Sequence, residues 1–434
     1  MTEKPLPTER GAVIVVGLGY GDEAKGATVD ALASHIGDTV AVARWSGGPQ
    51  AAHNVVHGPR HHTFRQFGSA TLQNVRTILM DTMLVDPLML DVEAHHLSDL
   101  GIVNPLNLVT VDPRCLVVTP IHAALNRARE EGRGKAAHGT CGLGIGETVA
   151  YAIACEHRAE AGDIIGNFTS PSDIEKDAEP LRFGDLADKA VTLRKLFQLA
   201  RYAEPLTGQQ FDRIATLADD LCGIAALVTV ADTHAEVLGA LEVGTVIFEG
   251  SQGVLLDEHA GFHPHTTWTT TTPARLDSFL RSHGHDPFVL GLTRSYSTRH
   301  GAGPMPTETA EVNVPEPHNR DDGAQGAWRQ GHLDLTALRY AIAASGGVDG
   351  VAVSHLDQMP AHAAVWKMGA DQLMQKIGLL YSMDRVRTVL AQQARASRIA
   401  LASTDDLLHR IAAVADAPVV LTAHGPARTD RMFL

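Results

Sequence analysis

The segment AVIVVGLGYGDEAKGATVDALASHIG, residues 12–37, constrains the fold of this chain more than any other part of the sequence. The apolar, β-branched run at 12–16 predicts a buried strand, and a helix is expected to begin near Lys25 and to end before Gly37. The glycine-rich turn between them would direct backbone N–H groups and the positive end of the helix toward an anion. We therefore expect a parallel sheet with an anion site at this turn.

The turn is close to a standard phosphate-binding loop but does not match it. From Gly19 the spacing is G-x-x-x-x-A-K-G, whereas the standard motif reads G-x-x-x-x-G-K-[ST]. Ala24 replaces the second glycine, and Gly26 stands where a Mg²⁺-binding hydroxyl would be. Asp22 is suited to act as a general base or a Mg²⁺ ligand, and Lys25 to neutralise a transferring phosphoryl group. The alternative is a turn that merely caps a helix.

Strand and helix patterns alternate along the rest of the chain. Apolar runs at 39–48, 244–253 and 347–357 open into polar loops, and 332–347 is typical of a helix that ends at glycines. This alternation predicts an α/β fold around a mostly parallel sheet with helices on both faces. Functional loops are expected at the carboxyl ends of the strands. The segment 311–330, rich in proline, glycine and charge, is expected to be the least ordered.

Composition excludes some classes of function. The chain has 434 residues and a net charge of -14, which argues against a general nucleic-acid surface but leaves room for a local cationic pocket. Its four cysteines form no C-x-x-C pair, as is typical of a reducing compartment. No apolar run approaches the roughly 20 residues of a membrane span, and the polar start has no signal-peptide core. We expect a cytoplasmic protein that is not bound to a membrane.

Two further stretches carry candidate site residues. The segment 44–56 contains a glycine pair, Gln50 and His53; a histidine is more often structural, and this chain has 23 of them. His53 becomes a candidate only if it lies beside the first loop. The segment 137–152 is a second glycine-rich loop that enters a helix, and Thr140 offers a hydroxyl there. On its own this segment fits a simple turn as well as an anion site.

The segment 248–274 has the most unusual composition. Gln252 follows a predicted strand, where an amide can bind a base edge, and six threonines within 266–272 suit a phosphate cradle. A surface strand is the alternative for these threonines. Three histidines in H-x-x-x-H-x-H spacing favour zinc only weakly, because no cysteine supports them. Farther along, Asp357 ends a strand, where its carboxylate can accept the N1–H and N2–H of guanine.

Taken in order, these pieces resemble the adenylosuccinate synthetase family. The motifs are Y-G-D-E-A-K-G, R-W-S-G-G-P-Q-A-A-H-N, G-T-C-G-L-G-I-G, F-E-G-S-Q-G-V-L-L-D, Y-S-T-R-H-G-A-G-P-M-P-T-E and S-H-L-D. The resemblance covers nearly the whole chain. It implies a single large P-loop-related α/β domain over residues 11–434, after a polar arm at 1–10.

The resemblance also implies a reaction. In this family the loop holds the phosphates of GTP, and its aspartate takes a proton from N1 of IMP. The activated O6 attacks the γ-phosphate to give 6-phosphoryl-IMP, and the amine of aspartate then displaces phosphate. A GTP-dependent, Mg²⁺-requiring ligase that forms C–N bonds in purine biosynthesis is therefore expected. A homodimer is expected too, because the family takes one arginine from a second subunit to hold the IMP phosphate.

Residue roles carry over at matching positions. The resemblance implies catalytic roles for three residues, Asp22, His53 and Gln252. The residues that would hold GTP are Gly21, Glu23, Ala24, Lys25, Gly26, Asn54, Arg329, His355, Asp357 and Gly425. Those that would hold the acceptor nucleotide are Gln50, Thr140, Arg158, Thr267 and Arg299. The ligands expected for Mg²⁺ are Asp22 and Ala52.

The departures from the family pattern concentrate at the amine. Near residues 323–331 the family has a T-T-G-R-x-R-R loop that holds both carboxylates of aspartate, and this chain has G-A-Q-G-A-W-R-Q-G. Only Arg329 aligns with the arginine cluster, so a dicarboxylate would lose several bonds of about 1.5–3 kcal/mol each. Smaller changes affect neighbouring sites: residues 49–52 replace an Asn-Ala-Gly stretch, and His355 replaces the lysine beside guanine.

Three hypotheses follow. The first is a divergent ligase that still phosphorylates a purine-type oxygen but uses an amine other than aspartate, or a different nucleotide. The second is ordinary adenylosuccinate synthesis with a rebuilt aspartate loop. The third is a nucleotide-binding protein without activity, against which the retained Asp22, Lys25, His53 and Gln252 argue.

Overall fold

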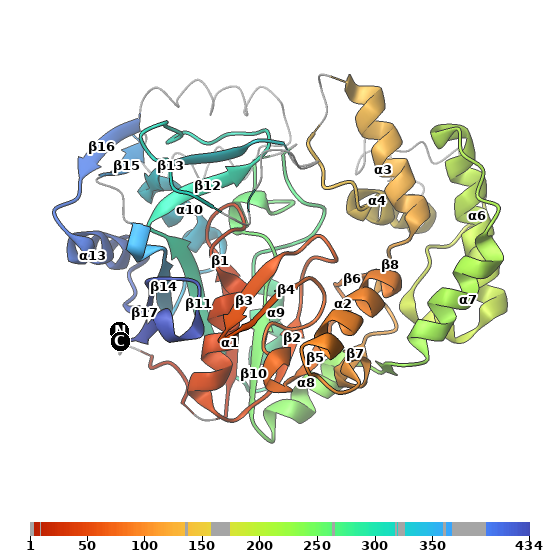
Figure 1. Cartoon of the computed structure of the whole chain (residues 1–434), viewed down its shortest axis with the longest axis horizontal. Coiled ribbons are helices and arrows are strands. Elements are labelled where there is room, and N and C mark those ends of the chain that lie inside the picture. Colours follow the sequence, from red (N-terminus) through yellow and green to blue (C-terminus); the bar gives the residue numbers. More distant parts are fainter. Residues whose placement is uncertain are drawn as a thin grey trace.

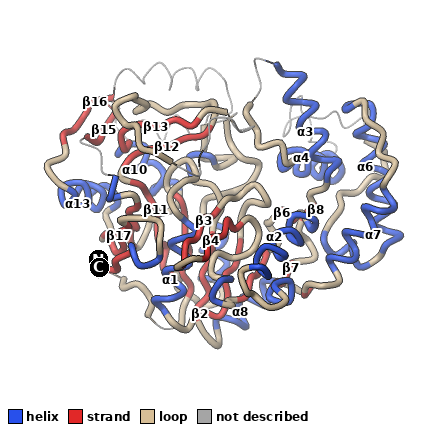
Figure 2. Tube along the Cα trace, viewed as in Figure 1, coloured by secondary structure: helices blue, strands red, loops and turns tan. Residues whose placement is uncertain are grey.

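A central sheet flanked by helices forms the body of the protein (Figure 1). This computed structural model describes residues 4–8, 10–134, 138–157, 174–262, 265–316, 319, 326–358, 362–366 and 396–434. Figure 2 shows the strands gathered in the middle of the molecule and a separate group of helices beside them. The α/β architecture expected from the alternating sequence pattern is confirmed.

The main sheet has ten strands, and every neighbouring pair is parallel except the pair at one edge. In spatial order the strands are β18 (Arg431–Phe433), β17 (Val419–Ala423), β14 (Gly350–Ser354), β11 (Phe288–Arg294), β1 (Ala12–Gly17), β10 (Thr245–Glu249), β2 (Thr39–Arg44), β5 (Arg76–Leu79), β7 (Val109–Val111) and β9 (Thr229–Val230). The antiparallel pair is β17–β18. The glycine-rich turn therefore lies near the middle of the sheet, after β1.

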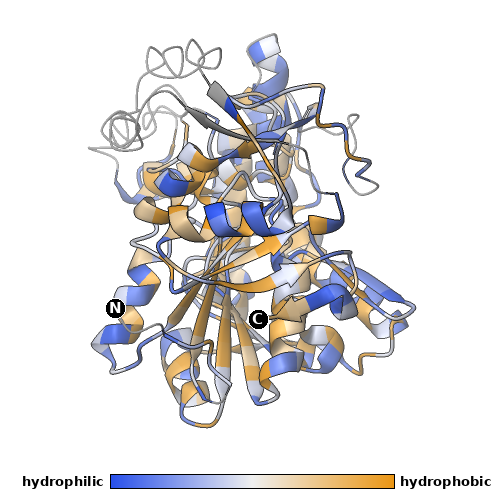
Figure 3. Ribbon diagram, turned by 90° about the vertical axis from the view of Figure 1, so that its left-hand side faces the viewer, coloured by the Kyte–Doolittle hydropathy of each residue, from blue (hydrophilic) through white to orange (hydrophobic). Residues whose placement is uncertain are grey.

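Both faces of this sheet are covered, as the continuous apolar strands require. Alternate residues of β1 point to opposite faces: Val13 and Val15 pack with the helix that follows the turn, and Ile14 and Val16 pack into the other core. Figure 3 shows the hydrophobic strands enclosed between more polar helices. The helix on the first face is α1 (Lys25–Ile36), and those on the second are α8 (Thr233–Leu241), α9 (Ala274–Ser282), α10 (Leu335–Ala344) and α13 (Thr404–Ala415).

A second group of helices has its own apolar core. Its members are α2 (Pro87–Asp99), α3 (Pro120–Arg133), α4 (Ile145–Glu156), α6 (Lys189–Thr207) and α7 (Ile214–Ala225). The described residues also form three small sheets: β3 (His53–His57) with β4 (Arg60–Phe64); β6 (Leu84–Val85) with β8 (Leu116–Val117); and β12 (Tyr296–His300), β13 (Trp328–Asp334), β15 (His362–Trp366) and β16 (Ala396–Ala400). Among the described residues, no helix is both long and apolar enough to span a bilayer.

Several local predictions can be checked. The helix expected from Lys25 to before Gly37 is confirmed as α1. The helix expected at 332–347 begins only at Leu335, because the first three of these residues extend strand β13. The threonine-rich segment 266–272 forms a loop and no strand. Much of 311–330 lies outside the described residues, so its expected low order stays a prediction.

The turn after β1 packs tightly on Gly253, and this contact makes a testable prediction. A Cβ added at Gly253 would lie 2.2 Å from the Gly19 oxygen and 2.8 Å from the Gly21 nitrogen. Gly253→Ala should therefore lower the free energy of unfolding by about 1–3 kcal/mol, as overpacking does. In urea unfolding the matched control is Gly223→Ala in α7, where a Cβ meets nothing within 4 Å. That control should be neutral or stabilising, and equal losses in both variants would contradict the prediction.

Candidate active site

One large cavity of about 820 Å³ lies at the carboxyl ends of the parallel strands. The loops after β1, β2, β10, β11, β14 and β17 all contribute to its lining. This is the position at which parallel α/β sheets bind ligands, and the volume suits a nucleotide-sized molecule. The site is therefore assembled by the sheet from segments that lie far apart in the sequence.

The loop before α1 is closed by its own charged residues. The Glu23 carboxylate accepts hydrogen bonds from the Gly21 amide (2.9 Å) and from Lys25 Nζ (3.2 Å). Lys25 Nζ also donates to the Gly21 carbonyl (2.6 Å). Ala24 adopts a left-handed backbone (φ 58°) directly before the first helical residue. Glu23 thus braces the loop from behind and does not line the cavity, whereas Lys25 does.

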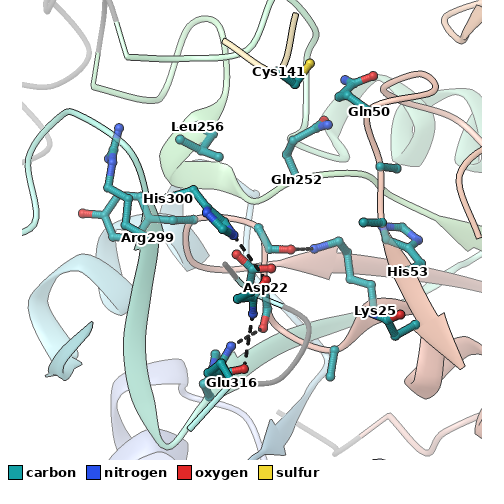
Figure 4. A pocket seen from close by; sticks show the side chains of 18 of the residues that line it. Asp22, Lys25, Gln50, His53, Cys141, Gln252, Leu256, Arg299, His300 and Glu316 are labelled. Atoms are coloured by element: carbon teal, nitrogen blue, oxygen red, sulfur yellow. Dashed lines mark hydrogen bonds and ion pairs between the residues drawn. The ribbon is translucent and has the colours of Figure 1, made fainter. Parts of the chain in front are cut away.

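Asp22 is the carboxylate that this loop presents to the cavity. Burial raises the pKa of Asp22 above its ordinary value. The nearby charges of His300 and Arg294 act in the opposite direction but do not cancel this effect. Arg294 Nη1 donates to the Asp22 backbone carbonyl (3.0 Å) and so ties the loop to the end of β11. Arg294 is in turn paired with Glu316 (Figure 4). A buried carboxylate with a raised pKa is suited to accept a proton from a substrate.

His53 faces the same cavity and is oriented by a buried glutamate. His53 Nδ1 lies 2.5 Å from Glu249 Oε1, and Glu249 also accepts hydrogen bonds from the Ser69 amide (2.9 Å) and hydroxyl (2.5 Å). Burial favours a neutral Glu249, but Arg44 and His53 overcome it and hold the pKa of Glu249 at about 2. Burial lowers the pKa of His53 to about 4. The ionised Glu249 therefore keeps the proton of a neutral imidazole on Nδ1, which leaves Nε2 for a ligand.

Two glutamine amides are buried at the cavity wall. Gln252 follows β10 in a left-handed backbone (φ 50°), and Gln50 lies in the loop after β2. Within the described part of the chain, both amide atoms of Gln50 and Oε1 of Gln252 have no hydrogen-bond partner. Figure 4 shows both side chains in the pocket, which Cys141 also lines. Because a buried amide without partners is costly, these groups are suited to bind a polar ligand.

The far end of the cavity is formed by loops after β14 and β17. His355 has a left-handed backbone (φ 60°) and contacts Ser354 Oγ through Nδ1 (2.9 Å), and burial lowers its pKa to about 3. The Asp357 carboxylate accepts a hydrogen bond from the side-chain amide of Gln358 (Nε2, 3.2 Å). Gly425 also lines the cavity. A neutral histidine and a carboxylate here are suited to a heterocyclic base with N–H donors.

Most of the residues singled out in the sequence meet in this cavity. Those in the lining are Gly21, Asp22, Ala24, Lys25, Gly26, Gln50, Ala52, His53, Asn54, Thr140, Gln252, Thr267, Arg299, His355, Asp357 and Gly425. Arg329 is not in the lining: it pairs with Glu308 through two nitrogens (3.0 and 2.5 Å) and donates to two backbone carbonyls. Arg299 lines the cavity but donates to the carbonyls of three neighbouring residues. Arg158 lies outside the described residues.

Sequence reasoning missed four residues beside the predicted set. Glu249 orients His53, Arg294 and Glu316 support the Asp22 loop, and His300 lies close enough to lower the pKa of Asp22. An acidic residue at the end of a buried apolar strand was the available signal for Glu249. No sequence pattern pointed to Glu316, because its partner Arg294 lies in a different element.

These features together are typical of a nucleotide-binding enzyme: a lysine-bearing loop at a helix start, a carboxylate and a histidine share one cavity. Comparison with known proteins gives the family. Residues 14–366 match the family model described as adenylosuccinate synthetase. The chain is 33% identical to adenylosuccinate synthetase of Proteus mirabilis over 350 residues, which is 76% of this chain and 73% of that protein. It is 30% identical to the Clostridium beijerinckii protein over 366 residues (80% and 78%).

Solved structures agree on the fold. Fully ligated adenylosuccinate synthetase from Plasmodium falciparum superposes with a TM-score of 0.74 at 18% identity, over 97% of this chain and 99% of that one. Succinoaminodeoxyadenylate synthetase of cyanophage S-2L, bound to dGMP and to dATP as an energy donor, gives 0.59 at 18% identity (98% and 95%). The chain belongs to the adenylosuccinate synthetase family and is a GTP-dependent ligase that forms carbon–nitrogen bonds.

The low pKa of His53 predicts a distinct response to acid. Its folded-state pKa of about 4 lies below the ordinary 6.5, so the stability contributed by the neutral ring is complete above pH 6.5. That stability is lost as the pH falls toward 4. His53→Gln cannot titrate, yet its amide can still donate to Glu249. When the pH is lowered from 7 to 4.5, the free energy of unfolding measured in urea should fall by roughly 1–3 kcal/mol more in the wild type than in the variant. Equal losses in both proteins would contradict a lowered pKa of His53.

Proposed function

We propose that this enzyme phosphorylates the 6-oxygen of IMP, or of a related purine nucleotide, at the expense of GTP and then displaces phosphate with an amine other than aspartate. The observation that carries the proposal is that Asp22, Lys25 and His53 open onto one cavity. A base, a phosphate loop and an imidazole at one place suit an oxygen nucleophile that attacks a terminal phosphate. We further propose that residues 11–434 act as one catalytic unit.

The chemistry needs two steps. Asp22 accepts the N1 proton of the purine, and the activated O6 forms a bond to the γ-phosphorus while the bond to GDP breaks. His53, with Nε2 toward the cavity, stabilises the transferring phosphoryl group, and Gln252 holds the purine. The amine then forms a bond to C6 and loses a proton, and the C6–O bond breaks to release phosphate.

Mg²⁺ fits the donor set at the loop. Magnesium is commonly held by one or two carboxylates together with substrate phosphates. Asp22 supplies a buried carboxylate at the cavity and Ala52 a backbone carbonyl in the same lining, while the described residues hold no cluster of three histidine, cysteine or acidic side chains that would form a separate metal site. A bound Mg²⁺ would neutralise phosphate charge at the γ-phosphate.

The amine is proposed to lack a second carboxylate. Arg329 is the only arginine that aligns with the family's aspartate clamp, and its Nε and Nη2 are bound to Glu308 while Nη1 is bound to Gly301 and Gly303. The carboxylate of Glu316 lies in the cavity lining near Asp22. These contacts favour a neutral or monocarboxylate amine over a dicarboxylate.

Ordinary adenylosuccinate synthesis is the second candidate. It is favoured by the curated relatives, which carry the name adenylosuccinate synthetase at 30–33% identity. Either reading includes a homodimer in which Arg158 of one subunit reaches the other's nucleotide, as the family resemblance implies. A protein that only binds nucleotides has no need for the base and imidazole that line this cavity.

Asp22→Asn tests the proposed base. The substitution preserves shape but removes the proton acceptor, so phosphate release from GTP with IMP and an accepted amine should fall about 10²–10⁴-fold. Titration calorimetry should show that IMP still binds. Asp416→Asn is the control. Asp416 is an exposed helix-capping residue with a left-handed backbone, and asparagine also tolerates this conformation. Retention of full activity in Asp22→Asn would exclude this aspartate as the base.

The amine is tested by product mass. The enzyme with Mg²⁺, GTP and IMP is supplied separately with aspartate, glycine and ammonium at equal concentration, and the nucleotides are analysed by mass spectrometry. We expect an adduct with glycine or ammonium and none with aspartate. A mass of adenylosuccinate would establish the second candidate, and nucleotide binding without phosphate release in every mixture would favour a silent binder.

A further inference from the structure

One corner of the cavity combines hydroxyl groups with a cation of the same chain. Arg133, the last residue of α3, lines the cavity together with Thr140 and Thr267. The rings of His138 and His265 lie 6.5 Å apart, which places the loop that carries Thr140 beside the loop that carries Thr267. The corner is therefore closed by two loops and the end of one helix.

The carboxylate of Glu130 organises this corner from outside the cavity lining. Its Oε1 accepts from Arg133 Nη1 (2.6 Å) and from the His138 amide (3.3 Å). Its Oε2 accepts from the amides of Gly139 (2.9 Å) and Thr140 (3.2 Å). One carboxylate thus fixes three successive backbone amides and one guanidinium, so the position of Arg133 is tied to that of the Thr140 loop.

Other groups at the corner also favour an anion. Asn126 on α3 donates to the Thr140 hydroxyl through Nδ2 (2.9 Å) and accepts from it at Oδ1 (3.1 Å), which fixes the place of this hydroxyl in the lining. The first residues of α4, Ile145 and Gly146, line the same cavity, and a helix start attracts negative charge. A guanidinium carries five N–H donors in a planar fork, so it can bridge a carboxylate and a phosphate.

We propose that Arg133 binds the 5′-phosphate of the acceptor nucleotide from within the same subunit, and that Glu130 is the positioning residue that aims it. This inference rests on the proposed function, because it assigns one end of the acceptor nucleotide to this corner. Thr140 and Thr267 supply hydroxyl groups, and Arg133 supplies the cation. An arginine from a second subunit would then add to a charge that the chain already provides.

The test compares a ligand that carries the phosphate with one that lacks it. IMP and inosine are titrated calorimetrically into the wild type, Arg133→Gln and Arg133→Lys. Wild type should bind IMP more tightly than inosine. Arg133→Gln should lose about 10-fold to 100-fold in IMP affinity with inosine affinity unchanged, since charge-assisted bonds to phosphate are removed. Arg133→Lys, which keeps the charge without the fork, should lose less.

Glu130 is tested by a conservative rescue. Glu130→Ala should weaken IMP but not inosine, and should raise the KM for IMP more than it lowers kcat. Glu130→Gln, whose amide oxygen still accepts from the loop amides, should recover part of the affinity. The control is Arg194→Gln in α6, which breaks an exposed pair with Glu179 (2.9 Å) and should leave both ligands unaffected.

Several outcomes would overturn the inference. They are a wild type that binds IMP no more tightly than inosine, an Arg133→Gln variant that binds IMP normally, or equal losses for both ligands. Phosphate release by the wild type is measured separately and tests the proposed function. An active wild type with unchanged Arg133→Gln binding would refute the phosphate site alone. An inactive wild type with a selective loss of IMP would refute the reaction alone.

Discussion

The buried carboxylate of Glu249 is the constraint on which the rest of the site depends. It ends β10 directly opposite Arg44, the last residue of β2. Arg44 is also fully buried and donates to the carbonyls of Arg65 and Phe67. Two buried charges need hydrogen bonds to offset their loss of water, and the loops that carry Arg65, Phe67 and Ser69 supply several of them. The positions of His53 and Ser69 follow from their hydrogen bonds to the charged carboxylate of Glu249.

The two halves of the cavity differ in how their charges are used. In the loop after β1, Lys25 and Glu23 bind each other, and Asp22 is the carboxylate presented to the cavity. The guanidinium groups of Arg294, Arg299 and Arg329 are bound to a carboxylate or to backbone carbonyls. An arginine bound in this way supports the fold and is a poor clamp for a second carboxylate. Asp22 and Lys25 thus line the cavity, whereas these three guanidinium groups are bound to other groups of the same chain.

The sequence predicted what local chemistry controls. The β-branched run, the glycine turn and the start of α1 at Lys25 follow from short-range preferences, and the parallel sheet then brings Asp22, Gln252 and Asp357 to one edge. The place of Glu249 at the end of a buried strand could be noticed in the sequence, but its pairing with His53, 196 residues away, is a tertiary contact that no local pattern predicts. A surface strand was the alternative for the threonine segment, but the Asp257 carboxylate holds the amides of Thr271 and Thr272 in a loop (2.5 and 3.1 Å). Tertiary hydrogen bonds decided both cases.

The odd composition of the first loop follows from this arrangement. A loop that only binds phosphate needs amides and a cation, and a carboxylate beside them would repel the ligand. Here Glu23 is turned inward and neutralised by Lys25, so it strengthens the loop without facing the phosphates. Asp22 faces the cavity, and burial raises its pKa above the ordinary value. The two neighbouring carboxylates of this loop therefore differ in their surroundings: Glu23 braces the turn, and Asp22 is presented to the cavity.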